Sequence, residues 1–172
     1  MKQKILIFFG FVLLSSCVGI VNPPEIIRDS VSIPKGKPLR IEFTGFTYYA
    51  AEMNHIKKNL TEKGYQENEK SEVLLEIILQ EKEAEYEHRG LHFLNLLASF
   101  LTLGVVPYHI RSEHILIYRV SESGKPPKES LHELLLDQWR GWILIPFSPF
   151  YWPSSSFEKS LINSLEEFEK QK

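Results

Sequence analysis

The stretch Val73-Leu74-Leu75-Glu76-Ile77-Ile78-Leu79 decides the fold that this chain is expected to adopt. It is rich in aliphatic residues and almost continuously apolar, a pattern typical of a strand that is covered on both faces. We therefore predict a central β-strand over residues 71–86. Its acidic distal part, from Glu81 onward, is expected to project past the core.

Upstream of this strand, the pattern predicts a first strand followed by a helix. Residues 39–46 begin with alternating apolar and polar side chains, as a half-buried strand does. Over residues 48–63, apolar side chains recur at helical spacing, and Gly64 follows as a residue that can close a helix. If the two flanking strands are parallel, this helix forms the crossover between them.

Downstream, the pattern predicts a second helix and two further strands. The helix covers residues 91–103 and ends at Gly104, and a strand follows at residues 108–120. We interpret residues 128–139 as another strand, although leucine and glutamate also favour a helix over residues 129–139.

The last element is predicted to be a helix with a capping box, in which Ser155 and Glu158 bond reciprocally to the first turn. It follows residues 141–153, where three prolines exclude one regular helix. The apolar stripe of this last helix consists of Phe157, Leu161, Leu165 and Phe168.

These elements define an α+β fold with a single sheet of about four strands and helices packed on one face. The expected order is strand, helix, strand, apolar helix, strand, strand, apolar loop and helix. We divide the chain into a signal peptide (1–16), a proline-rich tether (17–38) and a single α+β domain (39–172). Two apolar insertions, at residues 91–107 and 141–153, interrupt this domain.

The first residues follow the order of a secretory signal peptide. Two lysines precede the apolar run of residues 5–14, and the small Ser15 and Ser16 lead to Cys17. The apolar part is short for a spanning helix. Cys17 is the only cysteine of the chain, so no intramolecular disulfide can form. A simple secretory signal or an uncleaved anchor helix is the alternative interpretation.

The residues Leu14-Ser15-Ser16-Cys17 resemble the lipobox of bacterial lipoproteins, in which a large aliphatic and two small residues precede an obligatory cysteine. The resemblance implies cleavage between Ser16 and Cys17, and a diacylglyceryl thioether on Cys17. It also implies an acyl chain, such as palmitate, on the new amino terminus. Several acyl chains hold a protein on a membrane almost permanently, whereas one chain binds reversibly.

The residues after the cysteine bear on the destination of such a lipoprotein. Val18-Gly19 lacks the aspartate that commonly retains lipoproteins at the inner membrane. The resemblance therefore implies a lipid-anchored protein of the cell envelope, at the outer membrane and facing the periplasm. Residues 48–79 also resemble the α/β modules of small uncharacterised bacterial lipoproteins.

Length and charge limit the possible functions. Cleavage before Cys17 leaves 156 of the 172 residues, which suits one domain with a real core. Without Lys2 and Lys4, 18 basic residues stand against 22 acidic ones, so the net charge is about −4. The sequence has no basic stripe with interleaved aromatic residues, and we expect no nucleic-acid partner.

The apolar block at residues 91–107 has three interpretations. It is short for a membrane span, and His92 and Asn95 interrupt it. It can pack inside the domain, or it can lie in the membrane interface. We prefer the interfacial interpretation, because the block is an insertion between two strands and the other helices suffice to cover one sheet face.

Residues 141–153 are rich in tryptophan and tyrosine, which favour the headgroup region of a membrane. A hydrophobic lid over the sheet edge explains them equally well. Our hypothesis is that this segment and the 91–103 helix emerge on one side and, with Cys17, seat the domain on the membrane. The predicted membrane or partner contacts are Leu91, Phe93, Leu94, Leu97, Phe100, Leu101, Trp142, Phe147, Phe150, Tyr151 and Trp152.

We find no pattern of catalytic residues and do not expect an enzyme. His88 and His92 are four residues apart, but two ligands are too few for a metal site, and we interpret them as a solvated or headgroup-facing pair. No cofactor is expected beyond the diacylglycerol and acyl chain on Cys17. The expected partners are membrane lipid and an envelope protein.

These expectations favour a structural or adaptor protein of the cell envelope. The first alternative is a protein that binds lipid or another hydrophobic ligand, with residues 91–103 and 142–152 as the walls of a pocket. The second is an oligomeric pore or secretion component. The apolar blocks lack the two-residue alternation of membrane strands, which counts against a pore.

Overall fold

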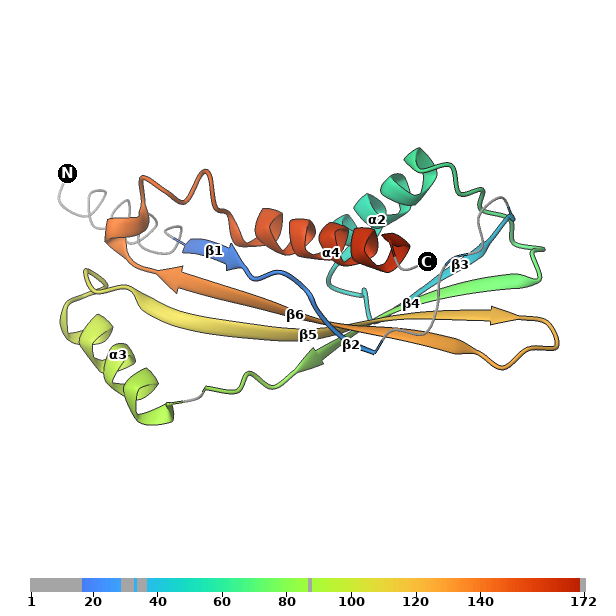
Figure 1. Ribbon diagram of the computed structural model, residues 1–172. Helices are drawn as coiled ribbons and strands as arrows, with labels where there is room; N and C mark the ends of the chain where they lie inside the picture. The colour runs from blue at the N-terminus through green and yellow to red at the C-terminus, as the bar shows by residue number, and fades with distance from the viewer. Residues whose placement is uncertain (1–16, 29–32, 34–36, 87, 171–172) are drawn as a thin grey trace. The chain divides into compact units, whose positions relative to one another are not determined.

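The computed structural model describes residues 17–28, 33, 37–86 and 88–170, so the predicted signal peptide lies outside the described residues. The described chain is α+β, with one open mixed sheet of six strands in the order β1-β6-β5-β4-β3, where β2 also pairs with β6 (Figure 1). Its elements are β1 (Cys17–Val21), β2 (Glu25–Arg28), β3 (Arg40–Thr44), α2 (Ala50–Glu62), β4 (Val73–Lys82), α3 (Arg89–Leu101), β5 (Tyr108–Glu122), β6 (Lys128–Arg140), the 3₁₀ turn η1 (Trp142–Leu144) and α4 (Pro153–Lys170).

From residue 39 onward, the predicted elements are present in the predicted order, and residues 128–140 form a strand and not a helix. The prediction of about four strands is wrong, because residues 17–38 contribute β1 and β2 where we expected an irregular tether. Both short strands pair antiparallel with β6. The hydrogen bonds of this long neighbour order a segment that has little periodicity of its own.

The start of the last helix also differs from the prediction. α4 begins at Pro153, whose missing N–H and fixed φ suit a first helical position. The backbone N–H of Ser156 donates to the carbonyl of Trp152 at 3.0 Å. Ser155 therefore lies inside the helix, and Glu158 pairs with His55, so the predicted capping box is wrong.

The chain forms two compact units, and the division falls within β5, β6 and α4. Unit 1 comprises Met1–Asn22, Glu83–Ser112 and Leu136–Phe157. Unit 2 comprises Pro23–Lys82, Glu113–Leu135 and Glu158–Lys172.

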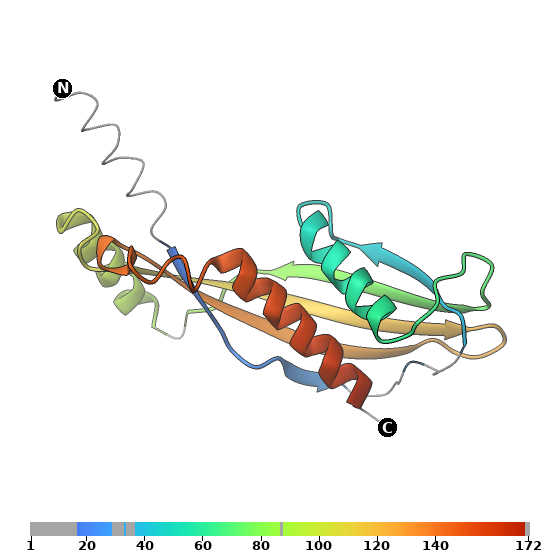
Figure 2. The same cartoon turned by 90° about the horizontal axis from the view of Figure 1, so that it is seen from above.

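In unit 2, helices cover one face of the strands. β3 and β4 are parallel and α2 connects them, while β4 and β5 are antiparallel. α2 and the unit 2 part of α4 lie over the same face (Figure 2). Val73, Leu75 and Ile77 are buried, whereas Leu74 and Glu76 between them are only half-buried. The expectation that this strand is covered on both faces is therefore wrong at Leu74 and Glu76, whereas the helices pack on one face as predicted.

The core of unit 2 contains a chain of buried polar side chains. The Ser164 hydroxyl lies 3.3 Å from the Tyr118 hydroxyl and 2.9 Å from Nδ1 of His132. Nε2 of the same histidine lies 3.0 Å from the hydroxyl of Ser130. Burial raises the pKa of Tyr118, and Phe168 stacks on its ring at 4.3 Å. These buried polar groups are thus paired, as a stable core requires.

The backbone turn that ends β3 can be tested by a substitution at Gly45, the residue that follows this strand. It has φ +83°, and a Cβ atom there would lie 2.0 Å from the carbonyl oxygen of Leu79. We expect Gly45→Ala to lower the free energy of unfolding by roughly 2–4 kcal/mol, because left-handed strain and a steric clash add together. Urea unfolding followed by circular dichroism measures this loss.

Gly64→Ala is the matched control. Gly64 has φ +87°, but a Cβ atom there would meet nothing within 4 Å, so only the left-handed strain of about 1 kcal/mol applies. Equal losses in the two variants would contradict the close approach of Gly45 to Leu79.

Candidate membrane-contact site

Helix α3, in unit 1, has its polar side toward the protein and its apolar side outward. His92, Asn95 and Ser99 recur at spacings of three and four and are half-buried. No residue of the helix is fully buried. A surface helix of a globular protein normally has the opposite orientation. The exposed apolar side chains of α3 are Leu91, Phe93, Leu94, Leu96, Leu97, Phe100 and Leu101.

Asn95 attaches this helix to the edge of β5. The ladder between β4 and β5 ends at the pair Lys82 and Glu113, so it does not reach the first residues of β5. There the Asn95 side chain accepts a hydrogen bond from the N–H of His109 at 3.0 Å and donates one to the carbonyl of Pro107 at 2.9 Å. Its carboxamide thus satisfies one donor and one acceptor of the chain at this edge, as a neighbouring strand would.

Tyr86 and His92 complete this attachment. The Tyr86 hydroxyl accepts a hydrogen bond from the N–H of Arg111 at 3.0 Å, and its ring stacks on His92 with centroids 3.8 Å apart. Nε2 of His92 lies 3.1 Å from the Tyr108 hydroxyl. Burial raises the pKa of Tyr108, with a further contribution from Tyr86. His92 is therefore packed against two tyrosines, and the interpretation of His88 and His92 as a solvated pair is wrong for His92.

Asp137, on β6 in unit 1, is the centre of a cluster of ion-paired side chains. Its Oδ1 accepts hydrogen bonds from Nε2 of His109 at 2.8 Å and Nε of Arg111 at 3.0 Å, and Oδ2 accepts one from Asn22 at 3.2 Å. Burial raises the pKa of Asp137, but the bonds from Arg111 and His109 outweigh burial and hold this pKa below its usual value. Within the described residues, no three His, Cys, Asp or Glu side chains form a group that could hold a metal ion.

Cys17, the predicted lipid-attachment residue, begins β1 in unit 1. It pairs with Arg140, the last residue of β6, and thus lies beside the start of the 141–153 segment. The side chain of Cys17 is buried, and its Sγ lies 3.8 Å from Oε1 of Gln138.

At Gly19, β1 is also hydrogen-bonded on the side opposite β6. The N–H of Gly19 donates to the carbonyl of Tyr151 at 2.7 Å, and its own carbonyl accepts a hydrogen bond from the Ser156 hydroxyl at 2.8 Å. A Cβ atom at this position would lie only 2.9 Å from Cα of Pro153, so the close approach requires glycine. The residues that follow Cys17 are therefore held on both sides and are not a free tether.

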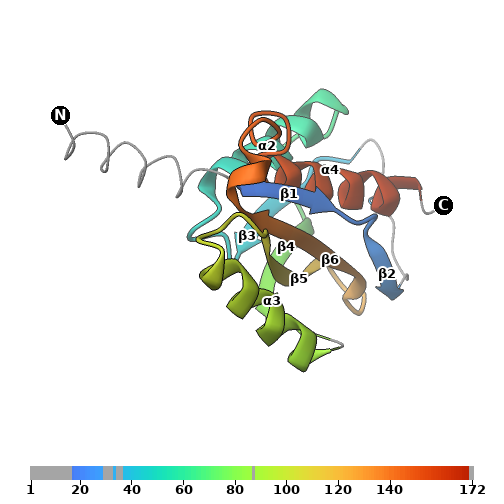
Figure 3. The same cartoon turned by 90° about the vertical axis from the view of Figure 1, so that its left-hand side faces the viewer.

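The 141–153 segment meets the end of α3 at one point. The N–H of Trp142 donates to the carbonyl of Gly104 at 2.9 Å, and its ring packs over Gly104. Elsewhere in unit 1, α3 and this segment lie on opposite sides of the ends of β5 and β6 (Figure 3). The hypothesis that the two emerge on one side is therefore wrong, and they meet where Trp142 contacts Gly104. Trp142 is half-buried, whereas Phe147, Phe150, Tyr151 and Trp152 are exposed.

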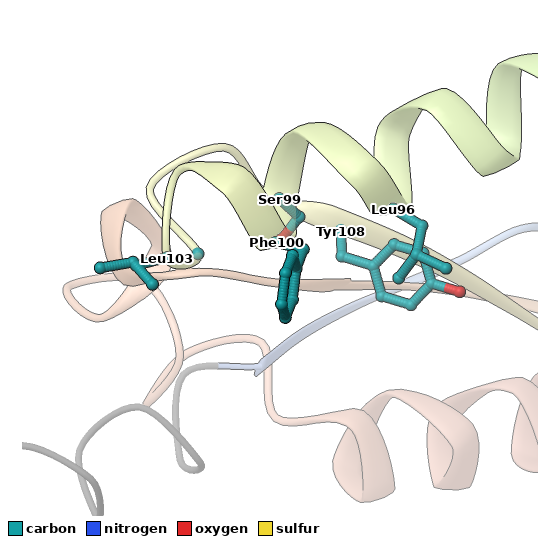
Figure 4. A pocket seen from close by; sticks show the side chains of 6 residues that line it. Leu96, Ser99, Phe100, Leu103 and Tyr108 are labelled. Carbon is teal, nitrogen blue, oxygen red and sulfur yellow. The ribbon is translucent and has the colours of Figure 1, made fainter.

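The turn after α3 forms an open hollow. Leu103 has φ +52° and Gly104 has φ +83°, so two successive residues adopt the left-handed conformation. The Leu103 side chain is 79% exposed. The hollow has a volume of about 390 Å³ (Figure 4). It is lined by Leu96, Ser99, Phe100, Leu103, Gly104 and Tyr108.

The sequence identified much of the exposed apolar surface but not what orients it. All six predicted contacts between residues 91 and 101 are exposed, and so are four of the five in the later segment. The helical spacing of His92, Asn95 and Ser99 defines a polar side of the helix and could have predicted this orientation. Within residues 91–107 and 141–153, the exposed apolar residues that the prediction missed are Leu96, Leu103, Val105 and Ile143.

No protein-family model matches the chain, and a search of curated proteins finds no significant match. None of the helices within the described residues combines the length and the hydropathy that crossing a bilayer requires.

We expect Asn95→Ala to loosen α3. The substitution leaves the His109 N–H and the Pro107 carbonyl without this partner, which typically costs about 1–3 kcal/mol. Hydrogen exchange of the α3 amides should therefore accelerate by about tenfold, since roughly 1.4 kcal/mol corresponds to a factor of ten.

The control is Leu94→Ala, which truncates an exposed side chain of the same helix and removes no hydrogen bond to β5. Equal acceleration in Asn95→Ala and Leu94→Ala would show that the carboxamide does not hold the helix.

Proposed function

We propose that this protein is a lipid-anchored lipoprotein of the bacterial cell envelope, whose unit 1 lies on the membrane and which serves as an adaptor for an envelope protein. The observation that carries the proposal is the orientation of α3, which holds its polar side against the protein and its apolar side outward.

The distribution of apolar side chains supports a membrane role for unit 1 specifically. Of the eighteen large apolar side chains that are exposed among the described residues, fifteen belong to unit 1. Among the described residues of unit 2, only Ile26, Ile27 and Tyr48 are large, apolar and exposed. Exposed apolar surface concentrated in this way is typical of a site that contacts a membrane or a partner.

Tryptophan and tyrosine in this surface suit a lipid partner. Both residues prefer the headgroup region, where the apolar part of the ring is buried and the polar tip is hydrated. Tyr151 and Trp152 are exposed in the 141–153 segment. In addition, residues 90–110 and 138–157 contain no Asp or Glu. Insertion of these segments would therefore bury no carboxylate and place none next to the anionic headgroups.

The place of Cys17 supports the same proposal. It lies opposite Arg140, one residue before the 141–153 segment, and this segment bonds to the end of α3 through Trp142 and Gly104. An acyl group on Cys17 therefore belongs to the same unit as both apolar segments. The lipid and the apolar residues around the contact between Trp142 and Gly104 would then bind the same bilayer.

A hydrophobic-ligand-binding role is the second candidate, and the hollow beside α3 favours it. Residues 142–152 do not line this hollow, so the two apolar segments do not form opposite walls of one pocket there. Leu96 and Phe100, which line the hollow, belong to the outward apolar side of α3, which connects this candidate with the membrane role.

Metabolic labelling tests the lipid anchor. Cells that express the full chain and are fed labelled palmitate should yield a labelled protein in the membrane fraction. The Cys17→Ala variant should lose the label completely, because the thioether needs the thiol. Labelling that persists in Cys17→Ala would rule out a lipid anchor at this residue.

Vesicle flotation tests the membrane surface without the lipid anchor. A chain that begins at residue 17 and carries Cys17→Ala keeps all described elements and should float with phospholipid vesicles. Leu94→Asn should lower its partition coefficient about fivefold, because burial of a half-exposed leucine contributes about 1 kcal/mol.

Ile27→Asn is the matched control, because Ile27 in unit 2 is 54% exposed and Leu94 is 57% exposed. It should leave flotation unchanged. A monomeric chain that stays at the bottom of the gradient, or equal losses in the two variants, would contradict a membrane-seated unit 1.

A further inference from the structure

We propose that the hollow at the end of α3 binds one acyl chain of a membrane phospholipid. This inference rests on the proposed seat of unit 1 on the membrane, and it names the ligand of one part of that surface.

The lining of the hollow selects hydrocarbon. Leu96, Phe100 and Leu103 supply apolar side chains, and none of the charged residues that the structure describes lines it. Tyr108 contributes its ring, because its hydroxyl is engaged with His92 at 3.1 Å. Figure 4 shows the side chains of Leu96, Phe100 and Tyr108 on the same side of the helix. A polar ligand would lose hydration in such a site and find only the Ser99 hydroxyl as a free side-chain hydrogen-bond partner among the lining residues.

The backbone at Leu103 supplies an independent observation. A leucine in the left-handed conformation costs about 1–2 kcal/mol, and φ at Leu103 is +52°. This turn keeps the Leu103 side chain at the mouth of the hollow, while the contact between Trp142 and Gly104 holds the turn in place. Strained residues of this kind concentrate at ligand sites, where the surrounding structure fixes them.

The size and openness of the hollow fit a chain that remains part of a bilayer. Its volume of about 390 Å³ lies in the lower part of the range of ligand pockets, roughly 300–1,000 Å³. Phe100 and Leu103 line it and are also among the most exposed residues of the α3 surface. The site is thus continuous with the surface that we propose to lie in the membrane, and a phospholipid chain can enter it sideways.

The geometry favours a bilayer lipid over the acyl chains of Cys17 itself. No residue of β1 lines the hollow, and the Sγ atom of Cys17 is buried next to Gln138 on β6. We therefore expect the site to be filled in a chain that has no lipid of its own.

The test uses Trp142, which packs on Gly104 at the hollow, as a reporter. The chain begins at residue 17 and carries Cys17→Ser, Trp139→Phe and Trp152→Phe, which leaves Trp142 as its only tryptophan. It is bound to saturating vesicles of phosphatidylcholine and phosphatidylglycerol in which the acyl chains are brominated. Bromine quenches tryptophan fluorescence at short range, so we expect strong quenching.

Leu96→Asn and Leu97→Asn form a matched pair on the same helix. Both leucines are 42% exposed, but only Leu96 lines the hollow. We expect at least twofold less quenching with Leu96→Asn and no change with Leu97→Asn. Ser99→Phe, which fills the hollow from its other side, should act like Leu96→Asn and guards against a local folding defect.

The outcomes separate this inference from the proposed function. A chain that binds vesicles but shows no quenching, or equal quenching in both leucine variants, overturns the acyl-chain site and leaves the membrane seat intact. Quenching that is absent from this chain and appears only in a lipidated chain, which retains Cys17 and carries a brominated acyl group there, assigns the site to the protein's own anchor and also overturns the proposal. A chain that does not bind vesicles overturns both.

Discussion

The two hydrogen bonds of the Asn95 carboxamide are the interaction on which the arrangement of unit 1 depends. They join α3 to the carbonyl of Pro107 and the N–H of His109, at a part of β5 that the β4 ladder does not reach. With His92 bonded to Tyr108 one turn earlier, they fix the rotation of the helix about its own axis. Once the polar stripe faces the strand, the remaining apolar side chains have no place except the outer surface.

In water, the exposure of these apolar side chains costs free energy, and contact with a bilayer would remove this cost. Each exposed leucine or phenylalanine of α3 gains about 1–2 kcal/mol from burial in hydrocarbon, while the bonds of Asn95 and His92 remain intact in either environment. The helix would therefore not need to rearrange for the insertion that we propose. A helix with the usual orientation would have to break its contacts with the core first, and a preorganised surface binds without that loss.

Sequence patterns predicted the elements that rest on local periodicity and missed those that rest on backbone partners. β3 and α2 carry a two-residue or a helical repeat, and β4 carries an almost continuous apolar run. Like α3, β5 and β6, each was predicted within a few residues. β1 and β2 form because their backbones pair with the edge of β6. Backbone pairing of this kind requires no particular side chains, so the sequence of residues 17–28 does not reveal it. Asn95 was read as an interruption of an apolar block for the same reason, since its partners are main-chain atoms of Pro107 and His109.

The strand at Cys17 changes what a lipid anchor can do in this protein. A proline-rich tether would let the domain move freely above the bilayer, but Gly19 is bonded to Tyr151 and Ser156 and is held there. Acyl chains on Cys17 would therefore enter the membrane at a fixed place beside the 141–153 segment. Once the acyl chains on Cys17 had inserted, the insertion of the apolar side chains of unit 1 would become an intramolecular step. The effective concentration of these side chains at the bilayer would then be high. In such an arrangement the anchor orients unit 1 as well as retaining it, and weak insertion by α3 is enough to hold that orientation.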